Sequence, residues 1–111
     1  MKNTVLIVDK PGGWDDSASV GALRSKGVTV HIADSVVQAG SFFNGKATAK
    51  VLVVGDVSGA SDLIRSIKDR FADAVWVVGL AEHIGPLANL GCNCFIPRDR
   101  VHTTAQAYLE R

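Results

Sequence analysis

Charged side chains follow the apolar runs of this chain at four points. Carboxylates are the ligands that a hard divalent cation such as Mg²⁺ takes in proteins. A Lys or Arg among them pairs with a carboxylate or with a phosphate group. The four segments are Asp9-Lys10, Gly55-Asp56, Gly79-Leu80-Ala81-Glu82 and Pro97-Arg98-Asp99. Whether their side chains meet depends on the elements that carry them.

Most other chemistries lack the residues they need. The chain has neither a Gly-x-x-x-x-Gly-Lys-Ser/Thr loop nor a Gly-x-Gly-x-x-Gly loop for a nucleotide. His31, His83 and His102 are scattered, and none has a motif spacing to a Cys or Ser, so nucleophilic catalysis has no support. Cys92 and Cys94 should share one face of a strand. We interpret them as buried core residues, because no further metal ligands stand nearby. We therefore expect no enzyme, no cofactor and no bound metal.

The composition is that of a single globular domain spanning residues 1–111. Its 12 basic and 11 acidic residues give a net charge of +1, which argues against nucleic acid or an anionic membrane as a partner. No apolar run reaches the roughly 18 residues of a membrane span. The first run, Val5–Val8, is too short for a signal peptide. Two cysteines make no disulfide framework, and we expect a cytoplasmic protein.

Short runs rich in β-branched residues indicate strands. Three runs are apolar at every position, as in strands buried on both faces of a parallel sheet. The run Val28–Ile32 alternates with polar Thr29 and His31, which is typical of an edge strand. Helical patterns lie between the runs, and Pro86 should weaken or kink the fourth helix. The predicted strands are Val5–Val8, Val28–Ile32, Val51–Val54, Val75–Val78 and Cys94–Ile96; the predicted helices are Ser17–Lys26, Ser35–Asn44, Ser61–Phe71, Ala81–Leu90 and Val101–Glu110.

Capping residues stand at several helix ends. Side chains that accept hydrogen bonds from a helix start precede three of the helices, and glycines follow three of them. The N-cap candidates are Asp16 or Ser17, Asp34 or Ser35, and Asp99; the C-cap glycines are Gly27, Gly45 and Gly91.

Strict alternation of strands and helices predicts an α/β fold of the (βα)5 type, with a parallel sheet and helices on both faces. Right-handed crossovers limit the topologies, and the flavodoxin-like strand order 2-1-3-4-5 places the three wholly apolar strands inside. Ligands of such sheets bind outside the carboxyl ends of the strands, at the topological switch point. We therefore expect the four charged segments to surround one pocket.

This arrangement resembles the receiver domain of bacterial two-component response regulators, over the whole chain and in the order of its elements. Receivers carry two acids after the first strand, a phosphoaccepting Asp after the third, a Thr or Ser after the fourth and a Lys after the fifth. The resemblance implies that Asp9 is the first acid and that Asp56 stands at the phosphoacceptor position. It also implies that Phe95 stands at the position of the switch aromatic.

Three of the five signature positions differ from the receiver pattern. Lys10 replaces the second acid, so a metal ligand is lost and a cation takes its place, able to pair with Asp9 or Asp56 permanently. Leu80 replaces the hydroxyl residue and cannot donate a hydrogen bond to a phosphoryl oxygen. Arg98 replaces the Lys; it can pair with a phosphate or with Asp56, but through a planar fork. We predict a degenerate pocket of these five residues and hence a pseudo-receiver without the Mg²⁺-dependent switch.

Two features of the loop after the first strand stay open. Asp15 and Asp16 are near enough to supply a replacement acid, or else they cap the following helix. Trp14 should lie near the mouth of the pocket, either as a partner contact or as a cover for the loop.

The resemblance also implies a partner face formed by the last three elements, or else an ordinary solvated surface there. We expect a non-enzymatic signalling domain that binds a protein partner or a second copy, with a histidine kinase as one candidate. It would be the N-terminal part of a longer regulator with a transcription output domain. Two alternatives are a divergent receiver phosphorylated on Asp56 and a flavodoxin-like small-molecule-binding domain. The face would include His83, Pro86, Asn89, His102, Thr103, Gln106 and Tyr108.

Overall fold

The computed structural model describes residues 4–9, 14, 18–43, 49–55, 57–71, 74–81, 92 and 94–109, and the statements below concern these residues. The predicted elements are confirmed there with ends that differ by at most two residues. The fourth predicted helix, Ala81–Leu90, lies outside the described residues beyond Ala81. The elements are β1 (Thr4–Val8), α1 (Ala18–Ser25), β2 (Thr29–Ala33), α2 (Val36–Phe43), β3 (Val51–Val54), α3 (Ala60–Phe71), β4 (Trp76–Leu80), β5 (Cys94–Ile96), the 3-10 turn η3 (Arg98–Arg100) and α5 (Val101–Leu109).

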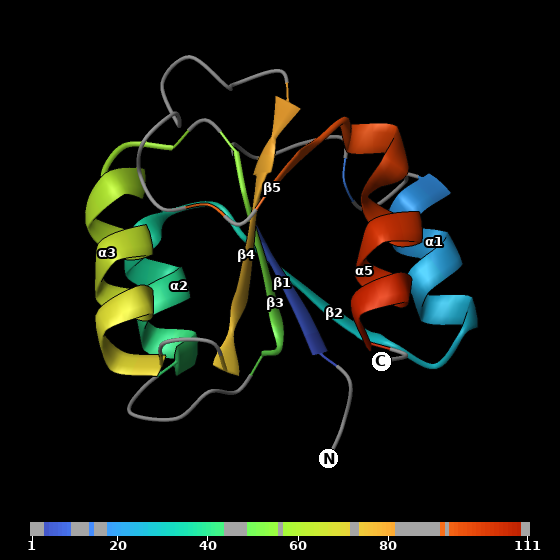
Figure 1. Ribbon diagram of the computed structural model, residues 1–111, viewed down its shortest axis with the longest axis horizontal. Coiled ribbons are helices and arrows are strands. Elements are labelled where there is room, and N and C mark those ends of the chain that lie inside the picture. Colours follow the sequence, from blue (N-terminus) through green and yellow to red (C-terminus); the bar gives the residue numbers. More distant parts are fainter. Residues whose placement is uncertain are drawn as a thin grey trace.

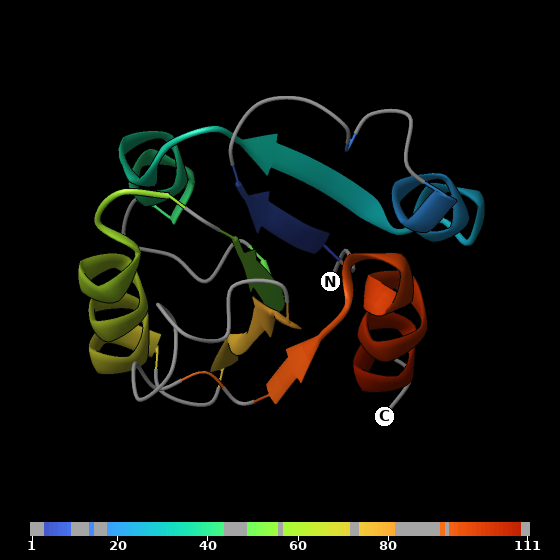
Figure 2. The same ribbon diagram turned by 90° about the horizontal axis from the view of Figure 1, so that it is seen from above.

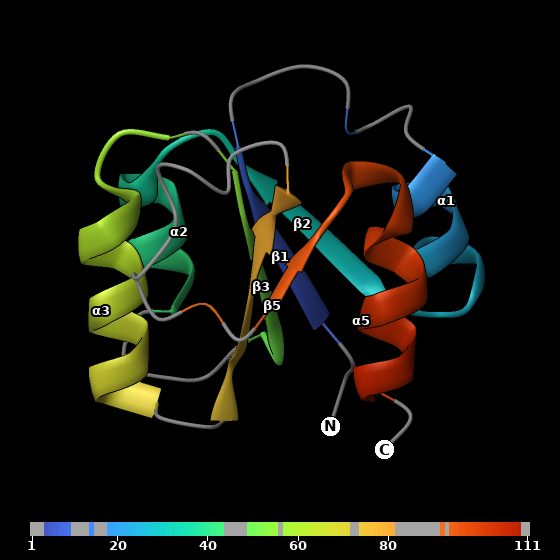
Figure 3. The same ribbon diagram turned by 45° about the horizontal axis from the view of Figure 1, so that its top comes forward.

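The strands form one parallel sheet of five strands in the order β2-β1-β3-β4-β5, as predicted. Helices α2 and α3 cover one face of the sheet, and α1 and α5 cover the other (Figure 1). The view from above in Figure 2 shows the sheet between these two helical layers. All strands therefore end at the same edge of the sheet (Figure 3). Among the described residues, Asp9, Gly55 and Arg98 follow strand ends there.

The burial of each strand follows from its place in the sheet. Every residue of β1 and β3 is buried, because helices cover both faces and strands flank both edges. Strand β2 lies at an edge; His31 is exposed there and Ile32 is half-buried. The alternating pattern of this run thus correctly predicted an edge strand.

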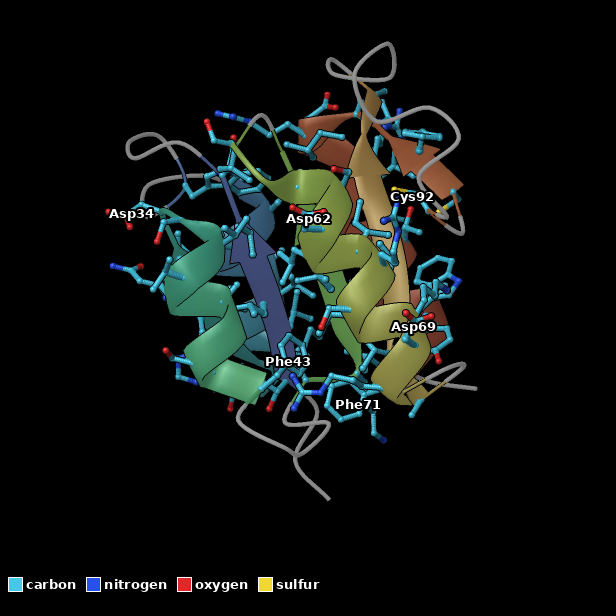
Figure 4. All side chains as sticks on the ribbon, turned by 90° about the vertical axis from the view of Figure 1, so that its left-hand side faces the viewer. Asp34, Phe43, Asp62, Asp69, Phe71 and Cys92 are labelled. Atoms are coloured by element: carbon cyan, nitrogen blue, oxygen red, sulfur yellow. The ribbon has the colours of Figure 1, made fainter. Side chains whose placement is uncertain are left out.

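Two apolar clusters fill the spaces on the two faces of the sheet, because successive strand residues point to opposite faces. Leu6 and Val8 of β1 face α2 and α3, whereas Val5 and Ile7 face α1 and α5. Figure 4 looks onto the α2–α3 layer and shows the rings of Phe43 and Phe71 together at one end of it; their centroids are 5.6 Å apart. Full burial of one such side chain stabilises the fold by about 1.5–3 kcal/mol.

The described helix ends test part of the predicted capping. The Ser35 hydroxyl accepts a hydrogen bond from the Gln38 N–H at 3.2 Å, so Ser35 caps α2 as predicted. Gly27 follows α1 with a φ of 82°, a conformation that favours glycine. Asp99 does not cap α5: it lies inside η3, because Pro97 directs the chain into a 3-10 turn in which the Arg100 N–H donates to the Pro97 carbonyl at 3.0 Å. Asp16, Ser17, Gly45 and Gly91 lie outside the described residues.

Candidate functional site

The carboxyl edge of the sheet brings together residues from the ends of several strands. Asp9 follows β1, Gly55 follows β3, Leu80 is the last residue of β4, and Arg98 opens η3 after β5. Of the other expected site residues, Lys10, Asp56 and Glu82 lie outside the described residues. The same holds for Asp15 and Asp16, so their role as replacement acids stays a prediction.

The carboxylate of Asp9 is buried and carries two hydrogen bonds on one oxygen. Arg98 Nη2 lies 2.7 Å from Oδ2 in a salt bridge, and the indole Nε1–H of Trp14 donates to the same Oδ2 at 2.8 Å. The side chain of Asp9 is 3% exposed. Hydrogen bonds with a charged partner are roughly twice as strong as neutral ones, so these two donors hold the carboxylate firmly.

The guanidinium of Arg98 also covers Trp14. Its Cζ lies 4.7 Å from the centroid of the indole ring, which is a cation–π contact. Trp14 is 1% exposed, whereas the Arg98 side chain is 41% exposed. Among the described residues, water therefore reaches this ion pair from the side of the guanidinium.

The backbone at Gly55 makes room for the Asp9 carboxylate. A Cβ at this position would overlap Oδ1 and Cγ of Asp9. The Gly55 N–H donates to the Val8 carbonyl at 2.7 Å, so the two strands are closely joined just before this point. Only glycine fits here without moving the carboxylate that Arg98 binds.

Leu80 lies inside β4 rather than in the loop after it. The predicted strand ended at Val78, but the ladder with β5 continues, with Leu80 opposite Ile96. The Leu80 side chain is fully buried in the cluster that also contains Trp14 and Val101. It therefore fills the core beneath the Asp9–Arg98 pair.

Phe95 points to the other face of the sheet. Gly79 is its neighbour in the ladder, and a Cβ on Gly79 would lie 2.6 Å from the Phe95 ring. The ring is half-buried against the α2–α3 cluster. The expected switch aromatic and Leu80 are thus separated by the sheet.

A second polar group links η3 to both helices of the α1–α5 layer. The hydroxyl of Ser19 in α1 donates to the Arg98 carbonyl at 2.9 Å and lies 3.1 Å from Nδ1 of His102 in α5. Ser19 is 2% exposed, and His102 is half-buried. His102 therefore contributes to the contact between α1 and α5 as well as lying on the expected partner face.

The remaining described residues of the expected partner face lie along α5. Gln106 and Tyr108 are half-buried, and Thr103 is exposed. The ring of Tyr108 stacks on that of Trp76 in β4, with centroids 4.7 Å apart and planes 9° from parallel. His83, Pro86 and Asn89 lie outside the described residues.

The two cysteines do not share a face, contrary to the expectation from their spacing. Strand β5 begins only at Cys94, so Cys92 lies in the preceding segment and packs against the α2–α3 cluster (Figure 4). Cys94 packs against the α1–α5 cluster. Both are half-buried free thiols rather than fully buried core residues. Burial raises the pKa of each thiol above 9.0; for Cys92 the positive charge of Lys68 partly opposes this effect.

The described residues at this edge do not fit a magnesium ion. Mg²⁺ requires oxygen ligands in near-octahedral geometry and is held in proteins by carboxylates and waters. Asp9 is the carboxylate that the structure describes after β1, and its Oδ2 already accepts hydrogen bonds from Arg98 and Trp14. No group of three or more His, Cys, Asp or Glu within the described part of the chain is placed to hold a metal.

Sequence reasoning did not predict the contacts of three residues of this site. Trp14 was expected at the pocket mouth, but its indole N–H donates a hydrogen bond to Asp9. A tryptophan five positions after an aspartate is only a weak sequence signal for such a bond. Gly55 appeared only as the residue before Asp56. Ser19 appeared only as part of a helix, and its contacts with residues 79 and 83 positions away carry no local signal.

Comparison with known proteins gives the fold. No family profile matches the sequence, and no curated protein matches it. Among solved structures, the chain is similar to a response regulator from Thermotoga maritima, with 20% identity, 100% of both chains covered and a TM-score of 0.75. It is similar to the non-phosphorylated receiver domain of HemR from Leptospira biflexa, with 22% identity over 99% of this chain and 93% of that one, and a TM-score of 0.69. It also matches NtrX from Brucella abortus, with 18% identity over 100% of this chain and 26% of NtrX, and a TM-score of 0.73.

The chain therefore has the receiver fold, a flavodoxin-like α/β sheet in the order 2-1-3-4-5. The predicted resemblance to receiver domains is confirmed at the level of the fold. None of the helices that the structure describes is both long and apolar enough to span a membrane.

Proposed function

We propose that this chain is a pseudo-receiver, a non-enzymatic cytoplasmic regulatory domain that acts through protein contacts rather than through Mg²⁺-dependent phosphorylation of Asp56. The observation that carries this proposal is the contact between Arg98 and Asp9. The guanidinium lies 2.7 Å from the carboxylate that a receiver would use for its metal. The chain thus supplies its own cation at that place.

The energetics favour Arg98 over a dissolved metal ion. An Mg²⁺ ion at Asp9 would compete for the carboxylate with Arg98 and with the Trp14 indole, which donates at 2.8 Å. A hydrogen bond to a charged group contributes about 1.5–3 kcal/mol. The loss of one such bond lowers an affinity by about ten- to a hundredfold. Arg98 pays no association entropy because it belongs to the same chain.

The sequence around Asp9 supports the same conclusion. Lys10 stands where a receiver carries its second acid, so one oxygen ligand is absent and a second cation is present. Leu80, at the position of the hydroxyl residue, is fully buried and has no donor for a phosphoryl oxygen. Each change weakens a different part of the phosphorylation chemistry.

Signalling would then depend on the surface formed by β5, α5 and the segment before β5. Gln106 and Tyr108 of α5 belong to it, and His83 and Pro86 are assigned to it from the sequence. A second copy, a regulatory protein or a histidine kinase is the expected partner. NtrX is much longer than the part that this chain matches. This difference in length supports the proposal that the domain is part of a longer regulator; that it is the N-terminal part, with a transcription output domain, is the expectation from the sequence.

Phosphorylation by a small-molecule donor tests the proposal. We expect no phosphoryl adduct by intact-mass spectrometry after incubation with acetyl phosphate and Mg²⁺, at concentrations that label an active receiver in parallel. An adduct that is lost in Asp56→Asn would instead make the chain a divergent working receiver. A co-purifying chromophore or nucleotide would support a small-molecule-binding domain.

A further inference from the structure

The carbonyl of Arg98 is held as specifically as its side chain. Two groups donate to this oxygen: the backbone N–H of Val101 and the hydroxyl of Ser19 at 2.9 Å. The same hydroxyl lies 3.1 Å from Nδ1 of His102. One residue thus binds Asp9 through its side chain and α1 through its backbone.

The chemistry of these groups fixes the direction of each hydrogen bond. A carbonyl oxygen only accepts, and a serine hydroxyl has one proton to donate. Ser19 must give that proton to Arg98, because two oxygens 2.9 Å apart with no hydrogen between them would repel each other. Ser19 can then only accept from His102, so Nδ1 of His102 must carry a proton.

We propose that Ser19 and His102 are positioning residues that hold Arg98 on Asp9, with His102 donating to Ser19 through Nδ1–H. This inference rests on the proposed function, in which Arg98 closes the pocket. Arg98, Ser19 and His102 connect the end of β1 to α1 and α5, because Arg98 binds Asp9, Ser19 binds the Arg98 carbonyl and His102 binds Ser19. The neutral imidazole is then the Nδ1–H tautomer.

Hydrogen exchange of the Trp14 indole N–H measures how often the contacts around Asp9 open, because this N–H donates its proton to the Asp9 carboxylate. Ser19→Ala should speed this exchange by roughly tenfold relative to the backbone amides of β3, as expected for one lost buried hydrogen bond. Ser25→Ala is the matched control: it removes another hydroxyl of α1, which donates to the Ala22 carbonyl within its own helix turn in an exposed hydrogen bond. That variant should leave the ratio unchanged.

A purely structural role of Ser19 would give a different result. Exchange at Trp14 and at the β3 amides would then accelerate by the same factor, and the proposal would be wrong. His102→Ala, at a half-buried position, is a second variant that should also raise the ratio. An unchanged ratio in both variants would overturn the inference.

The tautomer of His102 supplies an independent readout. Two-dimensional ¹⁵N–¹H NMR of the histidine rings should show Nδ1 protonated in the neutral form of His102. An Nε2–H tautomer with a bare Nδ1 would contradict the proposed hydrogen-bond direction. Neither experiment contains Mg²⁺ or a phosphodonor. Their failure would therefore leave the pseudo-receiver proposal standing, and labelling of Asp56 would leave the tautomer result unaffected.

Discussion

At the scale of single residues, the site is defined by what surrounds one carboxylate. Asp9 accepts hydrogen bonds from Arg98 and Trp14 on the same oxygen. Its carboxylate packs closely against the backbone of Gly55. The sequence predicted that Asp9 and Arg98 belong to one pocket, but it left Lys10 to pair with Asp9 or Asp56 and Arg98 to pair with a phosphate or with Asp56. The observed pair is 89 positions apart, and its choice depends on side-chain reach and burial that no local pattern encodes.

Gly55→Ala should destabilise the protein because the added methyl group would overlap the Asp9 carboxylate. Overpacking of this kind costs about 1–3 kcal/mol in the free energy of unfolding. Gly21→Ala is the matched control: nothing lies within 4 Å of its Cβ, and it stands in helix α1, where alanine is favoured by up to about 1 kcal/mol. Urea unfolding followed by circular dichroism measures both. Equal midpoints for the two variants would refute the close fit at Gly55.

The cysteines should react slowly with alkylating agents. Burial raises the pKa of the Cys92 and Cys94 thiols above 9.0, so little thiolate is present near neutral pH. Iodoacetamide labelling of the folded chain should therefore have its pH midpoint above that of the urea-unfolded chain. Because the folded pKa values are the higher ones, this contribution to stability is complete below pH 9.0 and is lost as the pH rises through them. A folded-state midpoint below the unfolded one would contradict the burial of these thiols.

At the scale of elements, the apolar patterns predicted most of the fold correctly. Wholly apolar runs predicted the inner strands, and the alternating run predicted the edge strand β2. The sequence did not show that β4 continues through Gly79 to Leu80, because glycine usually weakens a strand. The strand tolerates it here because the Phe95 ring fills the space beside Gly79. The sequence also missed the turn η3, which follows Pro97 and ends just before α5 begins at Val101, as predicted.

At the scale of the whole molecule, the expected switch aromatic and the residues around Asp9 lie on opposite faces of the sheet. Phe95 and Cys92 face the α2–α3 layer, whereas Asp9, Trp14 and Arg98 lie toward α1 and α5. Ser19 and His102 link Arg98 to α5, which carries part of the expected partner face. The fold, and the positions of Asp9 and Arg98 at the ends of strands, were thus predictable from the sequence, whereas the places of Lys10 and Asp56 stay predictions. The contacts within the pocket were not predictable, because they join residues from opposite ends of the chain.

An amide NMR titration with Mg²⁺, followed by beryllofluoride as a phosphoryl mimic, tests the central claim most directly. The account predicts no shifts at Asp9, Leu80 or Arg98 at millimolar Mg²⁺, because Arg98 already occupies the Asp9 carboxylate. It predicts no response to beryllofluoride either. Shifts that cluster at these residues and disappear in Asp56→Asn would contradict the account and establish a working phosphorylation switch.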